Sequence, residues 1–307
     1  MIKSVYGRGV ILSRFQYCTL IAENGPVADS GGTISFRGNS QGGTARVELL
    51  GPIGSGTLAI DSHNSPGVTV GSVEGDGEIL LGSNNLTVGT NNLSTTFSGL
   101  IEDGPSGKVA GSLTKVGTGT FTLSNASLTD TYTGGTTVSG GTLIVNNRNY
   151  SATGTGPVQV TAGTLGGKGK ISGAVTVGTG SGTGAFLAPA AGTTVQATLT
   201  IRSALTFDTD ATYTCTLRAK QNRARTDQVI ANGVTINSGA MIALSGETMG
   251  VLTQGMVLTL ISNTSANPIS GTFSNLPDGS IVTINGNNFQ ANYEGGDGND
   301  LTLTATN

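Results

Sequence analysis

The sequence predicts an all-β fold, a β-solenoid closed by a β-rich cap toward its C-terminal end. Three observations support this prediction: the composition, short alternating strands between turn signals, and an internal near-repeat. Of the 307 residues, 50 are Gly, 11% are charged and 5% are aromatic, whereas an ordinary domain has about 25% charged residues and about 7% Gly. The excess of Gly, Thr, Ser, Asn and Val favours turns and strands and leaves little material for helices.

Short apolar–polar alternations recur between the turn signals. A period of two places one set of side chains inward and the Thr and Ser set outward, as expected for half-buried strands. Strands this short fit a sandwich or a solenoid. The runs are Thr33–Phe36, Leu86–Val88, Thr120–Leu123, Thr142–Val145, Val158–Val160, Ala174–Val177 and Thr198–Ile201.

A near-repeat favours the solenoid. Gly134–Val138, Ser139–Leu143 and Thr161–Leu165 share the pattern small–Gly–Thr–apolar. Repetition at about 20 residues is typical of a coil whose rungs stack, with about 20–25 residues in each rung. A single rung cannot bury its apolar edge, but stacked neighbours bury it together.

Changes in sequence character predict three regions. Residues 1–25 are poor in Gly and are expected to form an N-terminal cap segment. Residues 26–203 are expected to form the solenoid. Residues 204–307 have fewer glycines, longer strands and hairpin-type turns at Asn232-Gly233 and Asn285-Gly286. We expect this last region to be a C-terminal β-rich cap or a continuation of the solenoid, because a cap covers the open edge of the last rung.

The segments Gly111–Ser124 and Asp130–Val145 closely resemble the autotransporter-associated β-strand repeat of bacterial passenger domains. Flanking segments are similar to the neighbouring rungs of such passengers, and Tyr293–Leu303 resembles their usual ending. The resemblance covers roughly residues 30–305. It implies a right-handed parallel β-helix that is exported through the cell envelope, with adhesion and self-association as the common roles.

The expected location is extracellular, at the bacterial cell surface. The apolar patch near the start is interrupted by Arg14 and Gln16, so the sequence predicts no signal peptide there. No stretch is long and apolar enough for a membrane helix, and we expect no membrane insertion. Because no translocator barrel is recognised either, we expect a stand-alone or trimmed passenger.

Candidate catalytic groups are few, and we expect no enzyme and no catalytic residue. His63 is the one histidine of the sequence and is expected to be a structural residue of a surface loop. Gly-x-Gly runs are interpreted as turns, because no helix follows that could bind a phosphate. Glycoside cleavage needs two carboxyl groups about 5–10 Å apart, normally with aromatic platforms. The candidate pairs are Asp76 with Glu78, Glu102 with Asp103, and Asp208 with Asp210.

The segment Gly295–Asp300 matches the start of a calcium-binding nonapeptide repeat. Its possible ligands are Asp297, Asn299 and Asp300. Such sites need consecutive copies, and Thr302 stands where the large apolar residue belongs. A turn leading into the last strand is therefore the preferred interpretation, with calcium as the alternative and no other cofactor expected.

The charge predicts which partners the chain can take. A net charge of −3 and a pI of about 5.1 give no electrostatic case for nucleic acid. The one basic cluster, Arg218, Lys220, Arg223 and Arg225, is followed by Asp227; a solvated loop is preferred over a polyanion site. Cys18 and Cys215 can form a disulfide only if the fold brings them together.

The sequence thus predicts an extracellular structural or adhesive β-solenoid. Its partner is expected to be itself, in a homo-oligomer or filament formed by end-to-end contacts or strand addition. Surface glycans are possible further partners. A polysaccharide-binding or polysaccharide-cleaving β-helix is the alternative function.

Overall fold

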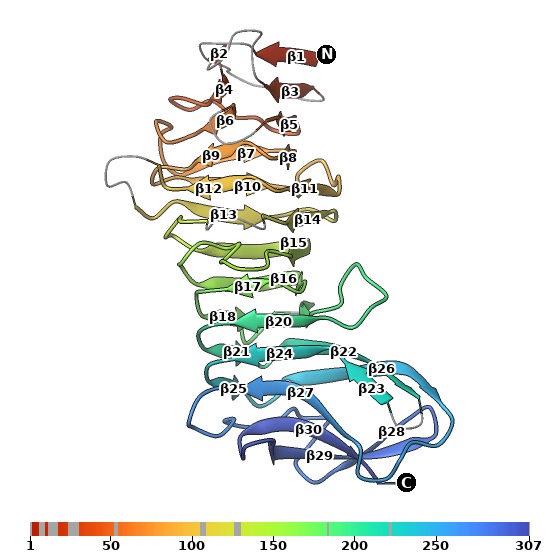
Figure 1. Cartoon of the computed structure of the whole chain (residues 1–307). Helices are drawn as coiled ribbons and strands as arrows, with labels where there is room; N and C mark the ends of the chain where they lie inside the picture. Colours follow the sequence, from red (N-terminus) through yellow and green to blue (C-terminus); the bar gives the residue numbers. More distant parts are fainter. Residues whose placement is uncertain are drawn as a thin grey trace. The chain divides into compact units, whose positions relative to one another are not determined.

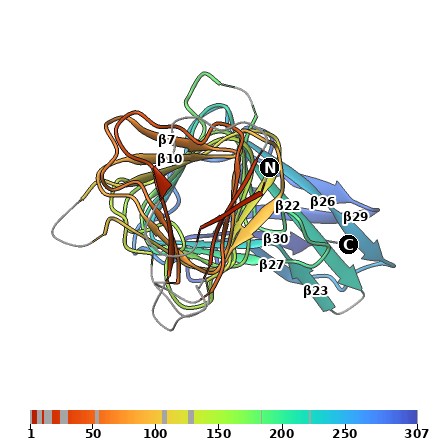
Figure 2. The ribbon, with the colours of Figure 1, turned by 90° about the horizontal axis from the view of Figure 1, so that it is seen from above.

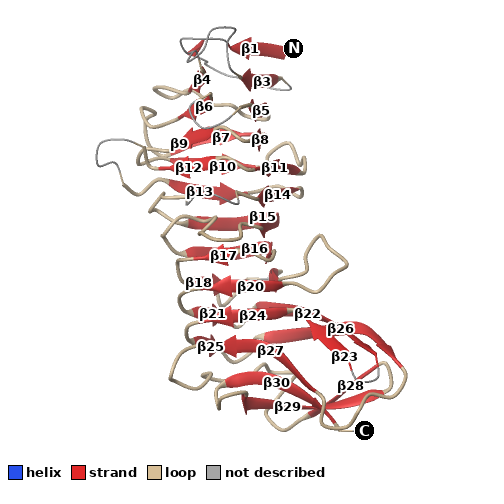
Figure 3. Ribbon diagram, viewed as in Figure 1, coloured by secondary structure: helices blue, strands red, loops and turns tan. Residues whose placement is uncertain are grey.

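The computed structural model describes residues 2–5, 10–11, 18–23, 31–51, 55–104, 109–125, 130–182, 184–220 and 223–306. These residues form strands, turns and loops, and none of them forms a helix (Figure 3). Accordingly, no helix able to cross a membrane occurs among them. The chain divides into two compact units, Met1–Val158 and Gln159–Asn307. The predicted all-β class is confirmed.

The first unit is a parallel coil with three columns of strands. In each column a strand pairs in parallel with the strand of the next turn. The first column contains β1(Ile2–Val5), β3(Thr19–Ala22), β5(Arg46–Leu49), β8(Ser72–Gly75), β11(Thr95–Phe97) and β14(Thr120–Leu123). The second contains β7(Gly67–Val70), β10(Asn85–Val88) and β13(Ser112–Lys115), and the third β2(Val10–Ile11), β4(Gly32–Ser35), β6(Gly56–Ala59), β9(Glu78–Leu80) and β12(Leu100–Glu102).

The longer strand β15(Thr136–Val145) joins two of these columns, because its first half pairs with β13 and its second half with β14. Between the halves, Gly141 has a positive φ of 62°. Seen from above, β7 and β10 lie one over the other (Figure 2), as their parallel register requires. This stacking is the defining feature of a β-solenoid.

The register shows how much chain each turn takes. In the first unit Thr19 pairs with Arg46, and Arg46 pairs with Ser72. In the second unit Thr212 pairs with Met241. Thr120 pairs with Thr142 and Gly163 with Ala185, each 22 residues apart, so the predicted rungs of about 20–25 residues hold for such turns, and longer corner loops lengthen the turns named above.

The core is a set of apolar columns inside the coil. Leu20, Val47 and Val73 occupy matching positions of β3, β5 and β8, and all are fully buried. Leu58 and Ile79 do the same in the third column. The alternation predicted from the sequence therefore has its physical cause here. Burying one such side chain is worth about 1.5–3 kcal/mol.

The second unit combines parallel turns with an antiparallel end. Its parallel strands are β16(Val158–Gly166), β17(Lys170–Ile171), β18(Val175–Val177), β19(Ala185–Ala188), β20(Thr198–Ile201), β21(Leu205–Phe207), β22(Ala211–Lys220), β24(Gln228–Ala231), β25(Val234–Ile236), β26(Met241–Met249) and β27(Val257–Asn263). The strands β28(Ile281–Ile284), β29(Asn287–Gly295) and β30(Asp300–Ala305) add to β27 in antiparallel pairs. This mixed sheet confirms the expected C-terminal β-rich cap.

Two features anchor the cap within the second unit. Phe273 packs against Phe207 and Tyr213, with ring centroids 5.2 and 6.2 Å away. The buried Tyr213 hydroxyl donates a hydrogen bond to the backbone oxygen of Leu260 at 2.9 Å. An aromatic cluster of this kind fixes the segment before β28 onto the last parallel turns.

The predicted N-terminal cap, residues 1–25, lies largely outside the described residues. Its described strands β1, β2 and β3 each pair in parallel with the following turn. The chain divides into its two compact units between residues 158 and 159. The region boundaries drawn from sequence character, at residues 25 and 203, stay predictions.

Candidate functional site

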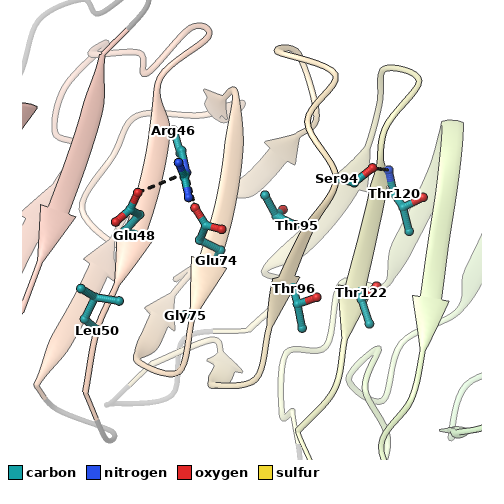
Figure 4. Close-up of a pocket in the computed structure, with 10 residues that line it drawn as sticks. All are labelled: Arg46, Glu48, Leu50, Glu74, Gly75, Ser94, Thr95, Thr96, Thr120 and Thr122. Atoms are coloured by element: carbon teal, nitrogen blue, oxygen red, sulfur yellow. Dashed lines mark hydrogen bonds and ion pairs between the residues drawn. The ribbon is translucent and has the colours of Figure 1, made fainter. Parts of the chain in front are cut away.

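A polar groove crosses the outer side of strands β5, β8, β11 and β14 in the first unit (Figure 4). Its volume is about 540 Å³. Most of its lining consists of charged groups and hydroxyls that the strand alternation turns away from the core. The lining residues are Arg46, Glu48, Leu50, Glu74, Gly75, Ser94, Thr95, Thr96, Thr120 and Thr122.

Arg46 links two glutamates at one end of this groove. Glu48 and Glu74 are register partners on β5 and β8, so their carboxylates lie on neighbouring strands. Arg46 Nε lies 3.2 Å from Glu48 Oε1 and donates a hydrogen bond to Glu74 Oε1. The hydrogen bond to Glu74 raises the pKa of Arg46 above its ordinary value, against the effect of burial, and the charges of both glutamates add to the rise. The guanidinium thereby offsets the repulsion of two like charges placed side by side.

Hydroxyl groups continue the groove across β11 and β14. Thr96 and Thr122 are register partners, and Ser94 Oγ accepts a hydrogen bond from the Thr120 backbone N–H at 3.0 Å. The groove therefore offers hydroxyls beside a charged cluster, which suits hydrogen bonding to a polar partner. The sequence analysis missed Arg46, Glu48 and Glu74. Glu48 and Glu74 are one turn apart in the chain, so knowing the length of that turn would have shown that they align.

The first two carboxylate pairs predicted from the sequence are rearranged in the structure. Asp76 Oδ1 accepts a hydrogen bond from the Gly51 backbone N–H at 2.8 Å. Glu78 on β9 instead has Glu102 on β12 as its acidic neighbour; burial, and then the charge of Glu102, raise its pKa. Asp103 is buried and accepts hydrogen bonds from Gly111 N at 2.9 Å and from Thr133 Oγ1 at 2.7 Å.

The third predicted pair also bonds to the coil itself. Asp208 Oδ1 accepts a hydrogen bond from Asn237 Nδ2 at 2.8 Å. Asp210 Oδ1 accepts from the backbone N–H groups of Thr179 and Gly180 at 2.8 and 2.7 Å. Burial acts to raise the pKa of Asp210, but these backbone donors outweigh it and lower the pKa. These contacts hold a turn in place.

His63 is buried rather than on a surface loop, with 9% of its surface exposed. Its Nε2 lies 2.8 Å from the backbone oxygen of Ser40, and its backbone bridges to Gly38 of the preceding turn. The predicted structural role fits these contacts, but the predicted surface position was wrong, because the loop folds inward against the preceding turn.

The calcium candidates lie in the turn between β29 and β30. Asp300 Oδ1 accepts a hydrogen bond from the Asn263 backbone N–H at 2.8 Å, and Asn299 Nδ2 donates to the backbone oxygen of Ser265 at 2.5 Å. Asp297 is exposed. No cluster of three His, Cys, Asp or Glu side chains that could hold a metal ion occurs in the described part of the chain. The calcium site stays a prediction.

The two cysteines differ in their surroundings and are not joined by a disulfide. Cys18 is half-buried beside β3. Cys215 is buried within β22, where its Sγ lies 3.2 Å from Thr226 Oγ1. Burial raises the pKa of the Cys215 thiol to about 12.

Three buried ionisable side chains lie between β12 and β15 of the first unit. Lys115 Nζ donates hydrogen bonds to the backbone oxygens of Val116 and Gly140, at 2.6 and 3.1 Å. Asp130 Oδ1 accepts from the Ile101 backbone N–H at 2.9 Å. The Tyr132 hydroxyl lies 2.6 Å from Thr136 Oγ1. Asp130 thus links two turns of the coil, while the contacts of Lys115 and Tyr132 are local or lie between strands that already pair.

The segment that contains these three residues is also the part of the chain that matches a known family. The model of the passenger-associated-transport-repeat family matches residues 113–145. This confirms the resemblance found in the sequence, since the repeat belongs to autotransporter passenger domains. Comparison with curated proteins finds no match to the chain.

The passenger-associated transport repeat thus covers strands β13, β14 and β15, and β15 stacks on the other two as the next layer of the coil. Its family implies a secreted or surface-exposed passenger. The sequence analysis recognised the repeat but not the burial of its Lys115. The sequence did indicate it, because Lys115 comes two residues after the buried Leu113 and therefore points to the same side of β13.

Proposed function

We propose that this protein is an extracellular structural and adhesive β-solenoid of a bacterial surface that associates with copies of itself. The family of the repeat supports the location. The observation that carries self-association is a strand edge in the C-terminal cap that has no hydrogen-bonded partner strand in the described part of the chain, although β26 passes close to β28. Among the described residues, β28 pairs with β29 and with no other strand.

The backbone of β28 has groups available for a further strand. β28 and β29 form a hairpin around Asn285 and Gly286, whose φ values are both positive, 47° and 77°. In a two-residue hairpin the residues that flank the turn exchange hydrogen bonds, and the pairs then alternate. The backbone groups of Ile281 and Thr283 are therefore turned away from β29.

The side chains of β28 offer no protection against pairing. The strand Ile281–Ile284 contains no charge and no proline, and Ile281 is 56% exposed. By contrast, the edge strand β23(Arg223–Thr226) carries exposed Arg223 and Arg225. Charged side chains on edge strands prevent unwanted pairing, and β28 lacks them. This difference favours β28 as the joint between copies.

The groove across β5, β8, β11 and β14 supports the adhesive part of the proposal, because its hydroxyls and charges can make many weak polar contacts. We expect the protein to act as a structural element rather than as an enzyme. In support, Asp76, Asp103 and Asp210 of the candidate carboxylate pairs accept backbone hydrogen bonds that hold the coil.

Electron microscopy over a concentration series tests the proposal. We expect fibres or regular assemblies of the unmodified chain as its concentration rises. The double variant Ile281→Lys/Thr283→Lys should stay dispersed at the same concentrations, because it places charges on the open edge.

A matched control is Leu93→Lys/Val109→Lys, which replaces two exposed apolar side chains of the first unit, 46% and 60% exposed, by the same two charges. It should assemble like the unmodified chain. Assembly of the double variant would exclude β28 as the joint. Dispersed particles of the unmodified chain at every concentration would overturn self-association and leave adhesion as the function to test.

A further inference from the structure

The basic cluster of the sequence lies on a strand hairpin rather than on the solvated loop expected for it. β22 and β26 run side by side over nine register pairs, and β23 folds back along the far end of β22 (Figure 1). Arg218 on β22 is the antiparallel partner of Arg225 on β23, and Lys220 is the partner of Arg223. Basic residues thus occupy opposed register positions on the two strands of the hairpin.

This arrangement works against the stability of the hairpin, because like charges on opposite strands repel. Arg218 has one weak ion pair, with Nε 3.7 Å from Glu247 Oε2. Arg223 and Arg225 are exposed, and neither makes an ion pair with another described residue. The hairpin therefore carries positive charge that the described part of the chain leaves largely uncompensated.

The neighbouring Asp227 does not compensate this charge, although it is adjacent in sequence. Its side chain is buried. Asp227 Oδ1 accepts a hydrogen bond from the Ala197 backbone N–H at 2.9 Å, and Oδ2 accepts from the Thr216 hydroxyl at 2.7 Å. The carboxylate is thus committed to the interior of the unit while the arginines stay at its surface.

A groove of about 340 Å³ lies beside the hairpin in the same unit. Arg225 lines it together with amide and hydroxyl side chains from β20, β24 and β27, and none of its lining residues is aromatic. Thr198 and Gln228 are register partners, so their side chains form a row across two strands. The polar lining residues are Gln196, Thr198, Arg225, Thr226, Gln228 and Thr259.

We propose that the hairpin and this groove bind an anionic polysaccharide, one that carries sulfate or carboxylate groups. Arg225, Arg218 and Arg223 supply the guanidinium groups, which recognise such anions through paired hydrogen bonds. Thr198, Gln228 and Thr259 supply donors and acceptors for sugar hydroxyls. The spread of cations over two strands suits a polymer with repeated charges. A single-stranded nucleic acid would need aromatic side chains for base stacking, which this groove lacks. This site does not depend on self-association at β28.

Binding of dextran sulfate and polygalacturonate, measured by isothermal titration at low salt, tests the proposal. We expect binding that weakens as salt rises, because counterions compete with the arginines. The triple variant Arg218→Gln/Arg223→Gln/Arg225→Gln should bind at least about tenfold more weakly, as expected when several charged contacts are lost. Its melting temperature should not fall, since the substitutions remove like-charge repulsion.

A matched control is Arg37→Gln/Arg148→Gln/Arg202→Gln, which removes three exposed arginines from other parts of the surface. It should bind like the unmodified chain. Equal loss in the control, absence of binding to both anionic polymers, or equal binding of neutral dextran would overturn the proposal. Equal or tighter binding of a single-stranded DNA would overturn the preference for polysaccharide.

Discussion

Lys115 is buried in the passenger repeat, with 1% of its surface exposed and with backbone oxygens around its ammonium group. Burial lowers its pKa from 10.5 to about 8. The folded state therefore disfavours the charged form relative to the unfolded chain. Where the folded pKa of a lysine lies below the unfolded value, stability increases as pH rises between the two values.

We expect the free energy of unfolding to rise by about 3 kcal/mol from pH 7 to pH 10.5 as Lys115 loses its proton, since each pKa unit corresponds to about 1.4 kcal/mol. The measurement is denaturant unfolding at several pH values for the unmodified chain and for Lys115→Met. The free energy of unfolding of the unmodified chain should rise with pH relative to that of Lys115→Met, and Lys168→Met, at an exposed lysine, is the control for the loss of a surface lysine. A constant difference for Lys115→Met would contradict the lowered pKa.

The thiol of Cys215 should be unreactive in the folded protein, because it is buried and its pKa is raised to about 12. In a Cys18→Ser variant, thiol labelling at pH 8 should proceed at the rate of unfolding. Labelling of Cys215→Ser, which retains the half-buried Cys18, should be faster. Rapid labelling of the Cys18→Ser variant under native conditions would show that the β22 interior is open.

Among the elements, close contact between neighbouring segments limits the substitution of glycine in strands and in corners alike. Gly271 and Gly255 have nearly equal φ values, 81° and 82°. A Cβ on Gly271 would lie 2.1 Å from the backbone oxygen of Ile236, whereas a Cβ on Gly255 would meet nothing within 4 Å. The two glycines therefore separate the cost of the backbone conformation from that of close contact between segments.

We expect Gly255→Ala to lower the free energy of unfolding by about 1 kcal/mol, the cost of a positive φ for alanine. Gly271→Ala should lower it by about 3 kcal/mol or more, because the methyl group also forces Ser270–Gly271 away from Ile236. Denaturant unfolding of both variants gives the comparison. An equal loss of stability in the two variants would mean that the backbone near Gly271 and Ile236 can move apart at no cost in free energy.

Alternation predicted most strand positions, because inward and outward side chains differ so sharply in polarity at Leu86–Val88 or Thr120–Leu123. It could not predict the three columns, since these depend on where each corner turns. The groove escaped prediction for the same reason: Glu48 and Glu74 meet only because the turn that joins them brings β5 and β8 into this register. The charged hairpin β22–β23 was mistaken for a loop because its charges hide the alternation of Leu217 and Ala219.

For the whole molecule, the net charge controls how readily copies associate. The net charge is −3 at pH 7, and the pI is about 5.1. Repulsion between copies therefore falls as pH approaches 5, and proteins near zero net charge associate more readily. We expect assemblies to appear at lower protein concentration at pH 5 than at pH 7.5, as measured by light scattering and electron microscopy. The Ile281→Lys/Thr283→Lys variant should show little of this gain, and amorphous aggregation of both forms would argue against an ordered joint.

Three of the four buried aspartates in the described part of the chain have one direction in common, whereas Asp103 accepts from Gly111 and Thr133, which come later in the chain. Asp130 accepts from the backbone of Ile101, Asp227 from Ala197 and Asp300 from Asn263, so each acceptor comes later in the chain than its donor. A coil that grows from its N-terminus therefore finds the donor already in place when the acceptor emerges. At these three positions the later turn bonds to the earlier one. Folding from the N-terminus would in this way tie each of these three turns to one that has already formed.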